Sequence, residues 1–407
     1  MLIEKKEFGD LVNPSRNRQT PIFNWHSFKH SYSRDLVERL IQEFNLKPGS
    51  WVLDPFCGGG TTLLTCKQHD INSTGFDILP FSVFLSNVKT REYDEVRLMR
   101  ELKKLISSRK HGSTRGKFPD IPLLKKAFAP HVKKELLLLK SRINDIKEDE
   151  VRDFFTLAFL GILESVSNTS KAGGFLRLVE RDTKTEDISS LFLARSAEMI
   201  SDVIKNGFIQ KKSSSSVKAL IGDARKLPTK RKFDAVITSP PYPNRHDYTR
   251  IYSLEMVFDF VFSNDELKQI RYDTLRSHVE ARKRYEPKGY SKPKRLTNLI
   301  SRINRNGTNN PQVIEMIEGY FEDMYLSLSE MKRCMRKKGK IGLVVSNVRF
   351  AGISVPVDEL LAEIGEQVGL STKTIWVARH RGNSSQQMKT YKRKTSRESI
   401  VIWEKRK

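Results

Sequence analysis

The 407-residue sequence contains few cysteines and no long apolar run. Its three cysteines, Cys57, Cys66 and Cys334, form no C-x-x-C pair, which excludes a disulfide framework and a cysteine-rich metal site. The densest apolar run, residues 154–163, is well short of the roughly 18 residues that span a membrane. The N-terminus carries charges where a signal peptide is apolar. We therefore expect a cytoplasmic protein with no membrane anchor and no metal.

Acidic residues are also scarce, since 48 Asp and Glu face 73 Lys and Arg and give a formal net charge of +25. Such an excess of basic residues is typical of proteins that bind nucleic acids, but Lys and Arg also cover the surfaces of ordinary soluble proteins. Charge alone leaves these two interpretations open. The 22 glycines and 16 prolines follow no short repeat, which excludes fibrous and low-complexity proteins and leaves a globular chain of two or three domains.

Strand-like and helical runs alternate along the chain, which predicts an α/β fold with a mainly parallel sheet and helices on both faces. We expect the last two strands, 373–379 and 399–404, to form an antiparallel hairpin at the sheet edge. Residues 92–216 show helical periodicity without a strand pattern, which predicts an inserted helical subdomain. The polar segment 264–312 holds 12 basic and 5 acidic residues, and we expect it to be mobile without a partner. The other expected strands are 51–56, 72–78, 217–223, 233–239 and 340–347.

Two motifs carry chemistry. In DPFCGGGTT, residues 54–62, a strand turns through three glycines into a helix, which leaves backbone N–H groups free and lets a ligand approach closely. Asp77 ends the next strand, where a carboxylate can accept hydrogen bonds from ribose hydroxyls. A dinucleotide site has the same outline, so these residues alone leave the cofactor open. In TSPPY, residues 238–242, two prolines at a strand end form a stiff backbone that presents one free carbonyl and one aromatic face.

Together these motifs resemble those of the S-adenosylmethionine-dependent DNA amino-methyltransferases, which modify cytosine N4 or adenine N6. DPFCGGGTT is similar to their cofactor motif, FxGxG, and TSPPY to their catalytic (D/N/S)PP(Y/F) motif. Residues 21–41 resemble the segment that closes over the methionine end of the cofactor, IGDARKLP resembles the segment beside its adenine, and residues 397–405 resemble the last hairpin strand. The matches extend over residues 21–77 and 217–404 and leave the helical insertion uncovered.

The resemblance implies a Rossmann-like methyltransferase with a mixed sheet, and it assigns site residues. The implied cofactor is S-adenosylmethionine, held by Ser33, Asp54, Pro55, Phe56, Gly58, Gly60, Thr61, Asp77 and Asp223. The implied catalytic residues are Ser239, Pro240, Pro241 and Tyr242. In this mechanism the Ser239 hydroxyl and the Pro240 carbonyl accept hydrogen bonds from the target amine, and Tyr242 stacks on a base flipped out of the duplex.

Cytosine C5 methylation is excluded, because it needs a nucleophilic cysteine in a catalytic loop and none of the three occupies one. Serine at the first position of the tetrapeptide favours cytosine N4, whereas Asp or Asn more often accompanies adenine; hydrogen-bond geometry permits both. His26 and His30 are spaced i, i+4 but lack a third metal ligand, which favours surface or packing roles.

DNA contacts are expected after the catalytic motif. The residues expected beside the base pocket are Arg245, His246, Asp247 and Tyr248. Arg245 could contact a phosphate or an orphaned base there. Alternatively, pairing between Arg and Asp side chains of this loop only stabilises the loop itself. The basic residues expected to grip DNA, rather than to form a solvated face, are Arg282, Lys283, Arg284, Lys292, Lys294, Arg295, Arg381 and Lys392. We prefer the basic segment 264–312 for target reading and the insertion for structural support.

The sequence thus predicts a site-specific, cytosine-N4 DNA methyltransferase that acts as a monomer on double-stranded DNA and protects it from a partner restriction endonuclease. The alternatives are adenine-N6 methylation, RNA amino-methylation and a non-catalytic DNA-binding role. The predicted parts are the cofactor-binding half (1–90), the helical insertion (91–216), the catalytic half (217–263), the basic segment (264–312) and the remaining sheet with its hairpin (313–407).

Overall fold

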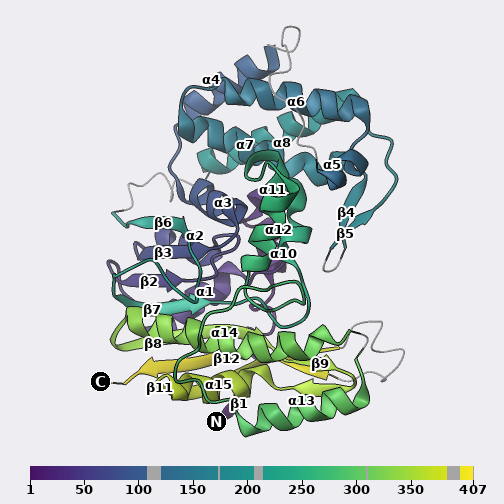
Figure 1. Ribbon diagram of the computed structural model, residues 1–407. Coiled ribbons are helices and arrows are strands. Elements are labelled where there is room, and N and C mark those ends of the chain that lie inside the picture. Colours follow the sequence, from purple (N-terminus) through teal and green to yellow (C-terminus); the bar gives the residue numbers. More distant parts are fainter. Residues whose placement is uncertain (108–120, 173–174, 206–213, 309, 383–394, 407) are drawn as a thin grey trace.

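An eight-stranded sheet forms the centre of the protein (Figure 1), with the strand order β1-β11-β12-β8-β7-β2-β3-β6. The computed structural model describes all residues except 108–120, 173–174, 206–213, 309, 383–394 and 407. Neighbours from β8 to β6 run parallel, whereas β12 is antiparallel to β8 and β11. The strands are β1 (Leu2–Glu4), β2 (Trp51–Asp54), β3 (Asn72–Asp77), β6 (Val217–Ile221), β7 (Phe233–Thr238), β8 (Met335–Ser346), β11 (Leu370–Gly382) and β12 (Thr395–Lys405).

The predicted mixed α/β sheet and its final hairpin are confirmed, but the prediction that this hairpin lies at the edge of the sheet was wrong. β1 pairs in parallel with β11 and lies outside it, and a run of three residues is too short to be predicted as a strand. A further small hairpin, β9 (Val348–Phe350) with β10 (Ile353–Val355), follows β8.

Helices cover both faces of the sheet because side chains alternate along each strand. On β2, Val52 packs in the core beneath α1 (Arg34–Phe44), while its neighbour Leu53 packs in the opposite core with α14 (Gln312–Cys334) and α15 (Val357–Gln367). Short 3-10 turns precede α1 at Lys6–Phe8, Pro14–Gln19 and Phe23–Trp25. Two more helices, α2 (Thr61–Gln68) and α3 (Pro80–Thr90), follow β2 and β3.

The insertion is helical, as predicted, and forms a layer beyond α3 in Figure 1. Its apolar core is shared with α3 and with α11 (Ser253–Asp259), so it packs on the sheet domain rather than standing apart. The prediction of no strands here was wrong: β4 (Thr169–Ala172) pairs with β5 (Phe175–Leu178), two strands of four residues each. Within the described residues, no helix is long and apolar enough to cross a membrane. The helices are α4 (Glu95–Ser107), α5 (Pro122–Ala127), α6 (Pro130–Asn144), α7 (Asp149–Val166) and α8 (Thr185–Lys205).

The basic segment 264–312 is built into both cores, contrary to the expectation of mobility. It contains α12 (Asn264–Asp273), whose Leu267 packs in the insertion core, and α13 (Lys294–Asn306), whose Leu296 packs against α14. The loop between them is anchored by Arg276, which pairs with the buried Asp323 of α14 at 2.7 Å. This anchoring was not predicted because it depends on partners distant in sequence.

Candidate functional site

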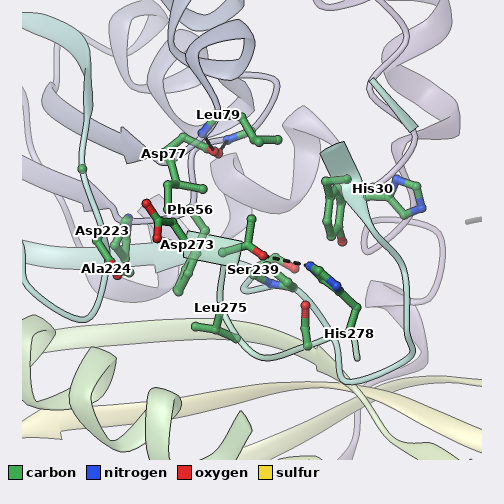
Figure 2. A pocket seen from close by; sticks show the side chains of 18 of the residues that line it. His30, Phe56, Asp77, Leu79, Asp223, Ala224, Ser239, Asp273, Leu275 and His278 are labelled. Carbon is green, nitrogen blue, oxygen red and sulfur yellow. Dashed lines mark hydrogen bonds between the residues drawn. The ribbon is translucent and has the colours of Figure 1, made fainter. Parts of the chain in front are cut away.

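A cavity lies beyond the carboxyl ends of β2, β3, β6 and β7, with about 730 Å³ of empty space that is partly open to solvent. Phe56 follows β2 and Asp77 ends β3, while Ser239 follows β7, so the two sequence motifs meet in one wall (Figure 2). The carboxyl ends of strands are the usual ligand sites of open α/β sheets.

The glycine turn requires glycine for conformation and for space. Gly58 and Gly60 have φ angles of 47° and 76°, in the left-handed region that side-chain-bearing residues rarely adopt. A Cβ atom at Gly58 would lie 2.9 Å from the ring of Phe28. The turn is held by Asp77, whose Oδ2 accepts a hydrogen bond from the Gly58 N–H at 2.9 Å. The cofactor-motif glycines therefore shape the wall of the cavity.

Two carboxyl groups, those of Asp77 and Asp223, line the cavity near the glycine turn, and their environments differ. Burial raises the pKa of Asp77 to about 6, although the backbone N–H groups of Leu79 and Gly58 donate to it. Burial also acts to raise the pKa of Asp223, but the adjacent Arg225 guanidinium, 2.8 Å away, outweighs it and holds that pKa below its ordinary value. At neutral pH both groups therefore present carboxylate oxygens to a ligand.

The charges of the lining distinguish between possible cofactors. Three carboxyl groups line the cavity, from Asp77, Asp223 and Asp273, and no Lys or Arg is among its lining residues. The cations beside this wall, Arg225 and Lys283, are paired with Asp223, so a pyrophosphate would face carboxylates in the lining, which disfavours a dinucleotide. A positively charged sulfonium fits the same wall, so the donor set suits S-adenosylmethionine.

The catalytic tetrapeptide follows β7, and its members are placed differently. Ser239 and Pro241 line the cavity, whereas Pro240 is buried and is not among the lining residues. Tyr242 also lies outside the lining; its hydroxyl donates to the buried Glu398 at 3.3 Å, and the Ser239 hydroxyl lies 3.5 Å from the same tyrosine oxygen. The structure therefore brings Ser239 to the cavity and anchors Tyr242 against β12.

Several residues predicted to bind the cofactor are structural in this arrangement. Asp54 is buried and accepts a 2.6 Å hydrogen bond from Thr238, which joins the ends of β2 and β7. The Ser33 hydroxyl caps α1 and donates to the Leu11 carbonyl, so Ser33 does not reach the cavity. Gly60 lies behind the lining, against Ser86.

Of the remaining predicted cofactor residues, Pro55 lines the cavity. Thr61 instead lines a second, more polar cavity that shares Phe28 with the first.

The lining also contains residues that sequence patterns did not assign to the site. Phe28, His30 and Tyr248 line the cavity, together with the loop that follows α12. Tyr248 lay in the stretch expected beside the base pocket, but residues 273–278 carried no motif signal. His26 is buried, 3.0 Å from Glu255, in agreement with a packing role.

The predicted DNA-contacting residues fall into two groups. One group is ion-paired within the chain, as in Lys292 with Glu318 at 2.5 Å, and consists of Lys283, Arg284, Lys292, Arg295 and Arg381. The other has no carboxylate partner within the described part of the chain and consists of Arg245, Arg282 and Lys294. Lys392 lies outside the described residues. No group of three or more His, Cys, Asp and Glu side chains that could hold a metal occurs in the described part.

Comparison with known proteins places the chain in a family. Residues 4–86 match the family model of N6/N4 methyltransferases described as "DNA methylase". The chain is 33% identical to Type II methyltransferase M.BsoBI of Geobacillus stearothermophilus, over 97% of this chain and 88% of the relative. It is 30% identical to Type II methyltransferase M.AvaI of Nostoc sp., over 97% and 89%. The solved structure of TrmN from Thermus thermophilus aligns over 91% of this chain and 48% of that chain at 10% identity, with a TM-score of 0.29 that is too low to inform the assignment. The chain belongs to the Type II DNA methyltransferases of the N4/N6 amino-methylating family.

Proposed function

We propose that this protein is a site-specific DNA methyltransferase that modifies the exocyclic N4 of a flipped cytosine and thereby protects DNA from a partner restriction endonuclease. The observation that carries the proposal is that Ser239 and Asp77 line one cavity at the ends of β7 and β3. The names of the relatives, Type II methyltransferase, support a DNA substrate and a restriction-modification pairing.

The methyl donor is S-adenosylmethionine, which supplies a methyl group on a positively charged sulfur when bound. Asp77 would accept hydrogen bonds from its ribose hydroxyls, and Asp223 would accept from its adenine amine. Phe56 and Ile78 supply apolar surface in the same part of the lining. The missing side chain at Gly58 lets the ligand approach the backbone, which explains why the turn cannot carry a larger residue there.

The residues at the end of β7 would activate the amine. An exocyclic amine is a poor nucleophile because its lone pair is delocalised into the ring. The Ser239 hydroxyl and the Pro240 carbonyl would accept hydrogen bonds from its two N–H groups and favour a tetrahedral nitrogen. The nitrogen lone pair would form the new bond to the methyl carbon as the methyl–sulfur bond breaks and S-adenosylhomocysteine leaves. The methylated amine would then release one proton to solvent water. Tyr242 would stack on the flipped base, which offsets part of the flipping cost of a few kcal/mol.

The cysteines support amine methylation over methylation at carbon C5. All three thiols are buried, and burial raises the pKa of Cys57, Cys66 and Cys334 above the ordinary value. Each therefore stays protonated at neutral pH, and no thiolate is available to attack a pyrimidine ring. Serine at position 239 favours cytosine as the target by resemblance to the N4 enzymes.

The basic residues after the catalytic motif would hold the duplex. Arg245 is exposed, and its backbone N–H donates to the Ser277 carbonyl at 3.1 Å, which ties the catalytic loop to the basic segment 264–312. We assign target reading to this segment and structural support to the insertion. The protein would act in the cytoplasm as a monomer on DNA.

Identification of the methylated nucleoside tests the proposal. The protein is incubated with tritiated S-adenosylmethionine and DNA or RNA, and each nucleic acid is digested to nucleosides. We expect the label in N4-methylcytosine from double-stranded DNA. Label in N6-methyladenine would assign the other base, and label only in RNA, or in no nucleoside, would overturn the proposal.

A further inference from the structure

The cavity has a second end, away from Asp77, where neutral polar side chains from separate segments meet. His30 comes from the N-terminal segment, Tyr248 begins α10 (Tyr248–Ile251), and Ser277 and His278 come from the loop after α12. Figure 2 shows His30 and His278 on the side of Ser239 opposite Asp77 and Asp223. This end adjoins the reacting serine, and the function proposed above assigns it no residue of its own.

Tyr248 is held rigidly in this end of the cavity. Its position at the start of α10 is fixed by the buried Asp247, whose Oδ1 accepts from the Thr249 N–H at 2.9 Å. The ring of His30 packs edge-on against the Tyr248 ring, with centroids 5.0 Å apart and an interplanar angle of 76°. Within the described residues, the Tyr248 hydroxyl has no hydrogen-bond partner. The tyrosine thus presents an ordered ring whose hydroxyl is free for a ligand.

The neighbouring Tyr242 is engaged elsewhere. Its hydroxyl donates to Glu398, its ring packs against the core beneath α14, and it is absent from the cavity lining. Of Tyr242 and Tyr248, only Tyr248 lines the cavity, and its hydroxyl has no partner within the described residues.

The surroundings select an uncharged occupant. His30 and His278 are neutral at neutral pH, because burial lowers the pKa of His30 to about 4 and lowers that of His278 as well. No Lys or Arg is among the described residues of the lining; Lys29 and Arg381 lie near enough to lower the pKa of His30 but do not line the cavity. A planar, neutral ring that accepts hydrogen bonds fits an aromatic face with one hydroxyl donor.

We propose that Tyr248 is a substrate-contacting residue of the target-base site: its hydroxyl donates to an acceptor on the edge of the flipped base, such as cytosine O2 or N3, and its ring packs against that edge. This inference rests on the proposed function and adds a second aromatic wall to it. Ser239 and Pro240 engage the exocyclic amine, and Tyr248 engages the ring. His30 is a positioning residue that supports the tyrosine ring.

The test compares Tyr248→Ala and Tyr248→Phe with the wild-type protein and with Tyr320→Phe, a control at a fully buried tyrosine whose hydroxyl has no partner in the described part of the chain. The methylated site is first mapped with the wild-type protein, and a duplex is made with that site and another with an abasic analogue at the target position. Binding of each duplex is measured in the presence of S-adenosylhomocysteine, and so is the affinity of each variant for S-adenosylhomocysteine alone.

We expect Tyr248→Ala to weaken binding of the base-containing duplex about fivefold or more, because it removes both the hydrogen bond and the ring contact, and to weaken binding of the abasic duplex less than twofold. Tyr248→Phe keeps the ring and should lose about 2- to 12-fold, the range for one hydrogen bond. Cofactor-product affinity should not change, and Tyr320→Phe should match the wild type throughout.

Equal losses on both duplexes would show a backbone or folding effect and overturn the inference. Unchanged binding by Tyr248→Ala, or a loss confined to S-adenosylhomocysteine, would also overturn it. Failure of the proposed function is seen separately, because the wild-type protein would then label no cytosine in DNA and no target position could be mapped.

Discussion

The cavity wall and the outer surface of the basic segment carry opposite charge patterns. The wall holds three carboxyl groups and no Lys or Arg, although the chain has a net charge of +25. The surface of residues 282–295 is basic, but most of its charges are already paired with the chain's own carboxylates. The comparison teaches that the basic side chains lie outside the cavity lining, where most of those in residues 282–295 pair with the chain's own carboxylates.

This division assigns each ligand to one region. The cofactor and the target base would be held by carboxylates, hydroxyls and rings inside the cavity, and the DNA backbone by lysines and arginines outside it. Substitutions inside the cavity should therefore alter methyl transfer or cofactor affinity without altering DNA affinity. Substitutions on the basic surface should alter DNA affinity without altering cofactor affinity.

The largest expected effect is that of Ser239→Ala. Removing the hydroxyl that accepts from the target amine should lower kcat at least about 100-fold, the lower range for loss of a group that assists proton transfer. Single-turnover methylation measures the rate, and calorimetry with S-adenosylhomocysteine should show unchanged affinity. If the variant transfers methyl groups at the wild-type rate, Ser239 has no place in the mechanism.

Asp77→Asn should have the next largest effect and should act on the cofactor. Loss of the charged acceptor is expected to weaken S-adenosylhomocysteine binding about 10- to 100-fold, the range for hydrogen bonds to a charged group. DNA binding measured without cofactor serves as the control and should stay within twofold of the wild type. Weakened DNA binding with intact cofactor binding would reverse the assignment of the two regions.

The raised pKa of Asp77, about 6, predicts a pH dependence of cofactor binding. The carboxylate accepts from ribose hydroxyls in its ionised form, which predominates above pH 6 and is lost as the pH falls through that value. Affinity for S-adenosylhomocysteine should therefore fall by up to about tenfold per pH unit below 6. Asp77→Asn, titrated in parallel, should lack this dependence; a flat wild-type profile would show that the ionised group is not used.

The smallest expected effect is a difference in DNA affinity between substitutions at two surface lysines. Lys294 has no carboxylate partner within the described residues, whereas Lys292 lies 2.5 Å from Glu318. If Lys294 contacts a phosphate, Lys294→Ala should lower DNA affinity a few-fold and reduce the salt slope by about 1, and Lys292→Ala should change the slope less. Equal slopes for both variants would remove the distinction between paired and unpaired charges.

The interior of the site was largely predictable from the sequence, because its residues follow buried strands. Phe56, Asp77 and Ser239 each lie at a strand end, and the carboxyl ends of neighbouring parallel strands meet at one edge of the sheet. The resemblance assigned Ser33 to the cofactor and did not reveal that its hydroxyl caps α1, a local role. Residues 273–275, 277 and 278 also line the cavity, and their position depends on the ion pair between Arg276 and Asp323, which are distant in sequence.

Pairing on the surface was not predictable for a related physical reason. Arg295 is neutralised by Glu359, and Arg284 by Glu315, across helices that only the folded chain brings together. A count of basic residues therefore overstates the charge available to DNA.

The most direct test of this division is to measure both affinities over one salt series, from 50 to 200 mM. The log of DNA affinity should fall by about 0.9 for each contacted phosphate per unit of log salt. Affinity for S-adenosylhomocysteine should change less than about twofold, because the described residues that line its site include no Lys or Arg. A flat DNA response, or a cofactor affinity that falls as steeply as the DNA affinity, would contradict the account.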